Sequence, residues 1–115
     1  MLVLHISTSD IEGGAARASF RLNQALNNNK KLNIKSSMRV LNMRSDDKTV
    51  FTSKSKIEKY KSKLKNIVSI KIQSLQKSTN NILHSSSIFS SKILDEINSS
   101  KADIIHLHWV QGEML

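Results

Sequence analysis

A glycine pair near the N-terminus is placed where an anionic ligand could bind. Gly13 and Gly14 are two of only three glycines among 115 residues, and they follow a short apolar run. Glycine allows positive φ and close approach of the backbone to another group. If a helix begins at this pair, its unpaired N–H groups and its dipole favour a phosphate or another anion. The pair therefore either lines a ligand cleft or forms a turn with no ligand.

Charged residues flank the glycine pair on both sides. Arg17 would lie in the first turn of that helix, where a cation is unfavourable unless a nearby anion offsets the dipole. We therefore expect Arg17 beside a ligand or an acidic partner, and Arg21, one turn later, in solvent. Asp10 and Glu12 would repel a phosphate, so their loop faces either the hydroxyl groups of an acceptor or solvent.

Three histidines and a tryptophan form a second group of chemical interest. His106 and His108 are two residues apart in an apolar run, so both project from one face of a strand. A His-x-His pair can bind a metal, but without a third ligand in view we favour a structural or cleft-lining role and predict no metal site. His5 approaches this pair if the first and last strands are neighbours, and we assign none of the three as a catalytic base. Trp109 either stacks on a sugar ring or covers the core.

Strands and a helix must position these residues. Residues 2–6 form an apolar run typical of a buried strand, and 34–43 is rich enough in apolar and β-branched residues to predict a second one. A helix between them would make the two strands parallel, through a right-handed crossover. That helix has four apolar residues at helical spacing, typical of a face packed on a sheet: Ala18, Leu22, Ala25 and Leu26.

The middle of the chain is polar and basic. The patterns predict a loop over 44–52, a lysine-rich amphipathic helix over 53–77, an irregular segment over 78–91 and one short helix over 90–99. The basic helix either packs its apolar stripe on the sheet, which we favour, or lies on an anionic membrane surface. Residues 102–109 form a compact apolar run that predicts a buried parallel strand.

Composition limits the class of protein. Lys and Arg total 18 against 9 acidic residues, and the net charge of +9 favours anionic partners such as nucleic acid, acidic lipid or a phosphorylated ligand. Cysteine is absent, which excludes disulfides. No apolar run approaches the ~20 residues of a membrane span and no signal peptide is evident, so we expect a cytoplasmic protein. The predicted fold class is α/β, a single partial Rossmann-like parallel sheet flanked by helices.

Two segments resemble the start of family 4 glycosyltransferases, most of all the colanic-acid and exopolysaccharide branch. They are residues 2–18, with the sequence LVLHISTSDIEGGAARA, and residues 103–109, with the sequence DIIHLHW. The resemblance extends over 1–22, the loop 45–47 and 102–112, whereas 53–91 matches only in position. It implies the GT-B architecture, in which two Rossmann-like domains face each other across a cleft and the C-terminal one holds most of the sugar nucleotide.

The same resemblance implies a role for this chain. Residues 1–115 would form part of the N-terminal, acceptor-side domain of a glycosyltransferase that acts in cell-surface polysaccharide synthesis. The cleft would be lined by Gly13, Gly14, Arg17, His108 and Trp109. After a segment like 106–109, family members continue into further strands, a His-Asp dipeptide and a second domain with an acidic donor-binding motif, whereas this sequence ends at Leu115.

We therefore expect a truncated fragment that lacks transfer activity alone and binds no cofactor. In the complete enzyme the partners would be a nucleotide-sugar donor and a glycan or lipid-linked acceptor, and the protein would lie in the cytoplasm or on the inner face of the membrane.

Two other classes of function are open. The basic charge would suit a small module that binds nucleic acid, but the five aromatic residues are scattered and no RNA-binding aromatic motif or helix-turn-helix is evident. The segment 53–77 would suit an accessory protein on an anionic membrane surface. A partial sheet also leaves an unpaired edge and an uncovered face, so we predict self-association.

Overall fold

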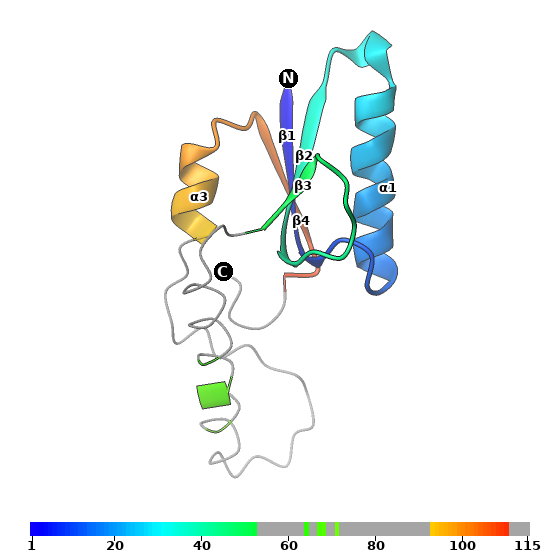
Figure 1. The fold of residues 1–115 in the computed structure, drawn as a ribbon. Coiled ribbons are helices and arrows are strands. Elements are labelled where there is room, and N and C mark those ends of the chain that lie inside the picture. The colour runs from blue at the N-terminus through cyan, green and yellow to red at the C-terminus, as the bar shows by residue number, and fades with distance from the viewer. Residues whose placement is uncertain (53–63, 65–66, 69–70, 72–92, 111–115) are drawn as a thin grey trace.

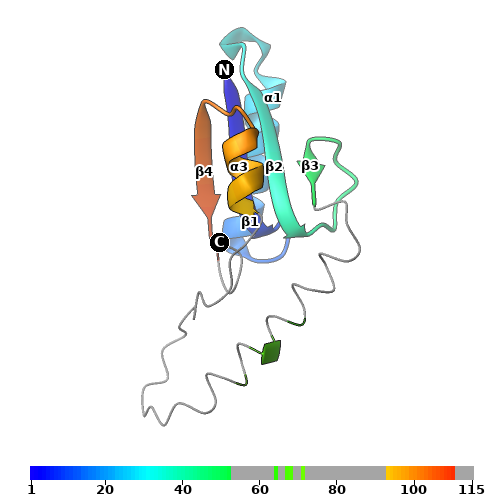
Figure 2. The ribbon, with the colours of Figure 1, turned by 90° about the vertical axis from the view of Figure 1, so that its left-hand side faces the viewer.

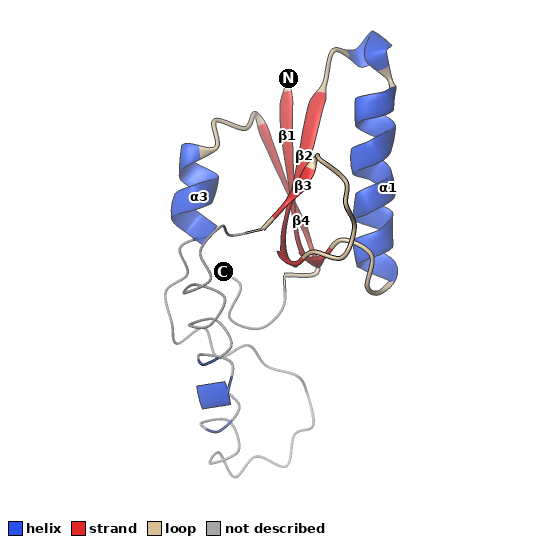
Figure 3. Ribbon diagram, viewed as in Figure 1, coloured by secondary structure: helices blue, strands red, loops and turns tan. Residues whose placement is uncertain are grey.

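The fold is a parallel β-sheet between two helices. The computed structural model describes residues 1–52, 64, 67, 68, 71 and 93–110. Its four strands lie in the order β3-β2-β1-β4, all parallel: β1 (Leu2–Ser9), β2 (Lys35–Asn42), β3 (Val50–Phe51) and β4 (Ile104–His108). Helix α1 (Gly14–Asn28) lies on one face and α3 (Ile93–Ser99) on the other, and a short 3-10 helix, η1 (Lys30–Leu32), follows α1 (Figures 1 and 3). The predicted α/β class with a partial Rossmann-like sheet is confirmed.

Strand β1 is the centre of the sheet. It pairs with β2 on one side and with β4 on the other. Backbone hydrogen bonds begin both pairings, from Lys35 N–H to Met1 O (2.9 Å) and from Asp103 N–H to Leu2 O (2.9 Å). The expectation that the first and last strands are neighbours is confirmed, so residues from the two ends of the chain share one register.

The segment 44–52, predicted to be a loop, contains the short strand β3. Met38 N–H in β2 donates to Thr49 O at 2.8 Å, and the next residue, Val50, is buried. A strand of two residues carries no periodic pattern, so the polar residues around it masked it in the sequence.

Helix α1 packs on the sheet through a partly polar face. Its buried residues are Ala16, Ser19 and Asn23, whereas Ala18 and Ala25 are exposed and Leu22 is 38% exposed. The predicted apolar face is therefore wrong for most of its residues, and only Leu26 is partly buried.

The buried polar residues of α1 are tolerated because they find partners. Asn23 Nδ2 donates to Thr49 Oγ1 at 2.7 Å, and Ser19 Oγ donates to Ala16 O at 3.1 Å. Asn27 both donates to Ser36 O and accepts from Ser36 N–H, at 2.9 Å each, so it holds α1 to the start of β2. Buried polar groups cost little when they are hydrogen-bonded in this way.

Two small apolar cores lie on opposite faces of the sheet. Under α1, Phe20 packs against a cluster of Met38, Val40 and Val50. Under α3, the second cluster consists of Leu4, Ile6 and Ile93, with Leu41, Ile97, Ala102 and Val110 packed against it. An ion pair between Arg39 Nε and Glu96 Oε2 (2.6 Å) joins β2 to α3. The second face is thus covered, at least in part, by α3.

Strand β4 is an exposed edge, and the prediction of a buried strand is wrong. Ile104, Ile105 and Leu107 are 45%, 42% and 48% exposed. In the part of the chain that the structure describes, β4 pairs only with β1, and it forms the free edge seen in Figure 2. An apolar run predicts burial, but the burial depends on a neighbour on each side. The predicted self-association stays a prediction, and this edge is where it would occur.

Much of the basic middle segment lies outside the described residues. This applies to the irregular segment predicted over 78–91 and to most of the helix predicted over 53–77, of which Leu64, Ile67, Val68 and Lys71 are described, with helical backbone and exposed side chains. The short helix predicted over 90–99 corresponds to α3. Among the helices that the structure describes, none is long and apolar enough to cross a membrane.

The packing of α1 can be tested by comparing its buried polar face with its exposed apolar face. Asn23→Ala removes the hydrogen bond to Thr49, so we expect the free energy of unfolding to fall by about 1–3 kcal/mol. Leu22→Ala, on the exposed face, should change it by less than about 0.5 kcal/mol. Urea unfolding followed by circular dichroism measures both, and a larger loss for Leu22→Ala would show that the helix is rotated.

Candidate functional site

The candidate site lies at the carboxyl edge of the sheet. Strands β1 and β4 both end there, and α1 begins beside it (Figure 1). Thr8 Oγ1 donates to Trp109 O at 2.9 Å and so joins the ends of the two strands. In open α/β sheets, ligands bind at this edge.

The glycine pair has the geometry that the sequence predicts. Gly13 has φ 92° and immediately precedes α1, a backbone conformation that L-residues rarely adopt. Gly14 is the first residue of the helix. A methyl group built on either glycine would meet no atom within 4 Å, so the space in front of the helix N-terminus is open. Gly13 is therefore needed for the turn because of its positive φ, and the open space at both glycines leaves room for a ligand.

Arg17 serves the loop before the helix. Its Nε donates to Ile11 O at 3.3 Å, and the Arg17 N–H donates to Gly13 O at 3.1 Å, the first hydrogen bond of α1. Its side chain remains exposed. The nearby acid Glu12 pairs with Arg44, with 3.0 Å between Oε1 and Nη2. The arginine therefore stabilises the loop before the helix while its side chain stays exposed.

Asp10 is a buried structural carboxylate, which the sequence did not reveal. It accepts the backbone N–H groups of Ser45 (2.7 Å), Arg44 (3.1 Å) and Ile11 (3.0 Å), so it ties the β1–α1 loop to the loop after β2. Burial alone would raise the pKa of Asp10, but hydrogen bonds from Ser45 and Arg44 hold it below the usual value of 3.8. Neither predicted role, toward an acceptor or toward solvent, fits a side chain with no exposed surface.

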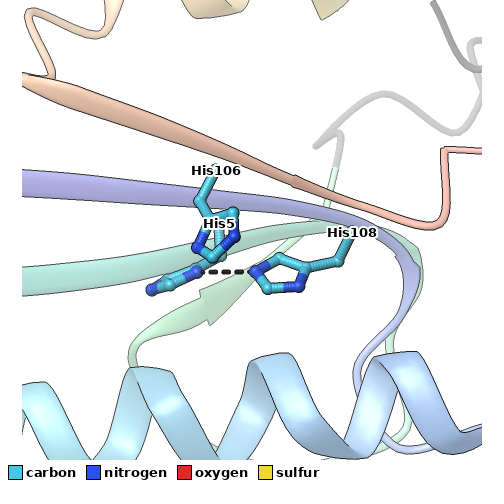
Figure 4. Close-up of side chains that lie close together, drawn as sticks. All are labelled: His5, His106 and His108. Atoms are coloured by element: carbon cyan, nitrogen blue, oxygen red, sulfur yellow. Dashed lines mark hydrogen bonds between the residues drawn. The ribbon is translucent and has the colours of Figure 1, made fainter.

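The three histidines come together on the α1 face of the sheet (Figure 4). His5 in β1 lies opposite His106 in β4, and Ser7 lies opposite His108. His5 is fully buried, and its Nδ1 is 3.1 Å from His108 Nε2. The rings of His106 and His108 have centroids 3.9 Å apart. The strand register therefore supplies the third imidazole that the His-x-His pair lacked in the sequence.

Two of the three histidines, His5 and His108, have lowered pKa values that favour their neutral forms. Burial, and then the positive charges that His108 and His106 would carry, lower the pKa of His5 from 6.5 to about 4. Burial, followed by the charge of His106, also lowers the pKa of His108. One proton can lie between His5 Nδ1 and His108 Nε2, which leaves His5 Nε2 buried with no partner among the described residues.

Neutral imidazoles can accept protons or bind metals. Three nitrogen atoms, one from each of these rings, lie within 4.8 Å of one another. Among the described residues that could bind a metal through histidine or carboxylate groups, these three histidines are spaced closely enough to share one ion.

Trp109 is exposed at the carboxyl edge of the sheet. It follows β4 directly, has φ 45° and is 68% exposed, so the alternative in which it covers the core is not supported. Its neighbours 111 and 112, also within the resemblance, lie outside the described residues. The five predicted cleft residues thus divide into Gly13, Gly14 and Arg17 at the start of α1, and His108 and Trp109 at the end of β4. Both groups lie at one edge of the sheet.

A separate groove of about 740 Å³ lies on the opposite face, between α3 and the sheet. It is lined mainly by apolar atoms and includes Phe51, Ile97 and the Arg39–Glu96 ion pair. The histidines and the glycine pair do not line it, so it is distinct from the carboxyl edge.

Comparisons with protein-family models, with curated proteins and with solved structures gave no match. Function is therefore inferred from the geometry of the carboxyl edge and from the resemblance of the two terminal segments.

The role of Asp10 predicts a strong effect of a small substitution. Asp10→Asn keeps the volume but removes the charge and one acceptor oxygen, so we expect unfolding free energy to fall by about 2–4 kcal/mol. Glu12→Gln, which breaks an exposed ion pair in the same loop, should cost no more than about 0.5 kcal/mol. Equal effects of the two substitutions in urea unfolding would contradict the buried role.

The lowered histidine pKa values predict a pH-dependent stability. Between pH 6.5 and about 4, the unfolded chain binds a proton at His5 that the folded chain does not. The contribution of neutral His5 to the free energy of unfolding should therefore be fully present above pH 6.5. The free energy of unfolding should fall as the pH is lowered, by up to about 1.4 kcal/mol per pH unit for each such proton. Urea unfolding over this range measures the slope.

Two variants provide the controls for this pH dependence. His108→Gln should reduce the slope of unfolding free energy against pH. It removes one histidine with a lowered pKa and also the positive charge that lowers the pKa of His5. His84→Gln removes the remaining histidine, from outside the described residues, and should leave the profile unchanged. A wild-type stability that is constant from pH 6.5 to 4.5 would show that the cluster is not buried as described.

Proposed function

We propose that residues 1–115 form the acceptor-side wall of a glycosyltransferase of the GT-B type, acting in cell-surface polysaccharide synthesis. The transfer of the sugar requires a second, donor-binding domain, so these residues alone do not turn over a sugar nucleotide. The resemblance of residues 2–18 and 103–109 to family 4 glycosyltransferases supports this role. So does the parallel sheet, whose βα turn after the first strand is the element that the GT-B architecture places at its cleft.

The observation that carries the proposal is the placement of an exposed tryptophan and an open helix N-terminus at one edge. Trp109 presents a large aromatic surface, which suits the apolar face of a sugar ring. Gly13 and Gly14 leave space at the start of α1, where N–H groups can donate to sugar hydroxyls or to a phosphate. Thr8, near the end of β1, holds Trp109 at this edge through its hydrogen bond to Trp109 O.

The chain's part in the reaction is to bind and orient the acceptor. An acceptor hydroxyl held at this edge would attack the anomeric carbon of the donor sugar as the bond to the nucleoside diphosphate breaks, and the hydroxyl proton would pass to the leaving diphosphate or to solvent. Arg17 lies at the same edge and, with the net charge of +9, favours an acceptor that carries phosphate, as lipid-linked glycans do. No residue is assigned as the catalytic base.

Sugar binding can be measured directly, because Trp109 is the only tryptophan in the sequence. We expect hexose oligosaccharides to change its fluorescence in a saturable way, at concentrations up to about 10 mM. Gly14→Val narrows the space at the helix start and should weaken this binding. Leu22→Ala, on the exposed face of α1, is the matched control and should bind as the wild type does.

Two outcomes would contradict the proposed function. The first is a fluorescence that no oligosaccharide changes. The second is turnover of a UDP- or GDP-sugar by the purified chain, which would show that no second domain is needed.

A further inference from the structure

We propose that His5, His106 and His108 form a binding site for one divalent transition-metal ion, of which Zn²⁺ is the representative. This site is independent of the proposed sugar-transfer function, because it lies in the strands on the α1 face and not in the open space before Gly14.

The backbone already places the three ligands. Parallel pairing of β1 and β4 fixes His5 opposite His106, and His108 follows on the same face. In a tetrahedral site with Zn–N distances of ~2.0–2.1 Å, the nitrogen atoms are ~3.3 Å apart. His5 Nδ1 and His108 Nε2 are 3.1 Å apart, and the full set lies within 4.8 Å. His106 is exposed, so rotation of its side chain can close the remaining gap without moving the backbone.

The existing hydrogen bond supports a metal-binding role. Two imidazole nitrogens that face each other at 3.1 Å can share only one proton. This hydrogen bond joins two of the rings and leaves the third, His106, out. A metal ion in place of that proton would be bound by both nitrogens and by the third ring as well. His5 is buried and its Nε2 has no partner among the described residues, so an apolar residue would cost less at this position if packing were its only role.

The ligand set indicates the class of metal. Three imidazoles with no carboxylate or thiolate in the cluster suit Zn²⁺, Co²⁺, Ni²⁺ or Cu²⁺ rather than Mg²⁺ or Ca²⁺, which prefer oxygen. His106 is exposed and His108 half-buried, so a fourth position is open to water or to an oxygen of a ligand. Three protein ligands and one open position are the arrangement of catalytic zinc sites rather than structural ones.

The outer contacts indicate a moderate affinity. Metal-bound histidines usually donate their second N–H to a carboxylate or carbonyl, and loss of such a partner costs roughly 10- to 100-fold in affinity. His5 Nε2 has no such partner among the residues described. We therefore expect a dissociation constant for Zn²⁺ of about 0.1–10 μM.

Calorimetric titration of the full chain with ZnCl₂ at pH 7.5 tests the site. We expect one ion per chain, and His106→Gln and His108→Gln should each weaken binding by at least about tenfold. Both residues are partly or fully exposed, so these variants should fold, which circular dichroism checks. His84→Gln is the matched control, because it removes the fourth histidine of the sequence and leaves His5, His106 and His108 in place, and it should bind as the wild type does.

Spectroscopy tests the buried ligand without mutation. Co²⁺ should give the visible absorption of a tetrahedral site. Zn²⁺ should shift the ¹⁵N resonances of the His5 ring in a long-range ¹H–¹⁵N correlation spectrum. The proposal would be overturned if Zn²⁺ does not bind at one ion per chain, or if its binding leaves the His5 ¹⁵N resonances unchanged. It would also be overturned if His106→Gln and His108→Gln bind Zn²⁺ as tightly as the wild type does, or if His84→Gln abolishes binding.

Discussion

The parallel pairing of β1 with strands on both sides is the interaction on which the rest of this structure depends. β1 takes β2 from the next segment of the chain and β4 from far along it, so one strand joins both ends of the sequence. The register of these pairs sets which side chains share a face. It brings His5 beside His106 and His108, and it brings the ends of β1 and β4 to one edge, where Thr8 binds the backbone of Trp109. A shift of one residue would separate both groups.

Polar side chains help to hold this small fold together. Among the residues that the structure describes, each of the two apolar cores contains three buried residues. Asp10 and Asn27 bind backbone groups of neighbouring segments, and Arg39 crosses from β2 to α3. Such contacts are directional, so they specify one arrangement of loops and helices even where their net contribution to stability is modest.

The carboxyl edge and the histidine cluster share β1 and β4 but differ in chemistry. The edge is open, bordered by glycine N–H groups, an arginine and an exposed indole, which suits a polar ligand such as a sugar or a phosphate. The cluster is partly buried and has only imidazole nitrogens, which suits a metal ion. His108 is the one member of the cluster that was also predicted to line the cleft, and its ring lies against His5 (Figure 4).

The sequence by itself determined the local elements of this protein. It predicted the first strand, a glycine turn after it, the helix that follows, the second strand, the short helix before the last strand and the parallel order, because periodicity, glycine and β-branched residues act over a few positions. Only the tertiary structure decided which faces are buried. Leu22 is exposed and Asn23 buried, β4 is an edge, and Asp10 binds a distant loop, because each outcome depends on partners from elsewhere in the chain. The approach of His5 to His108 was predicted only on the condition that the first and last strands are neighbours, and the tertiary structure supplies both that pairing and its register.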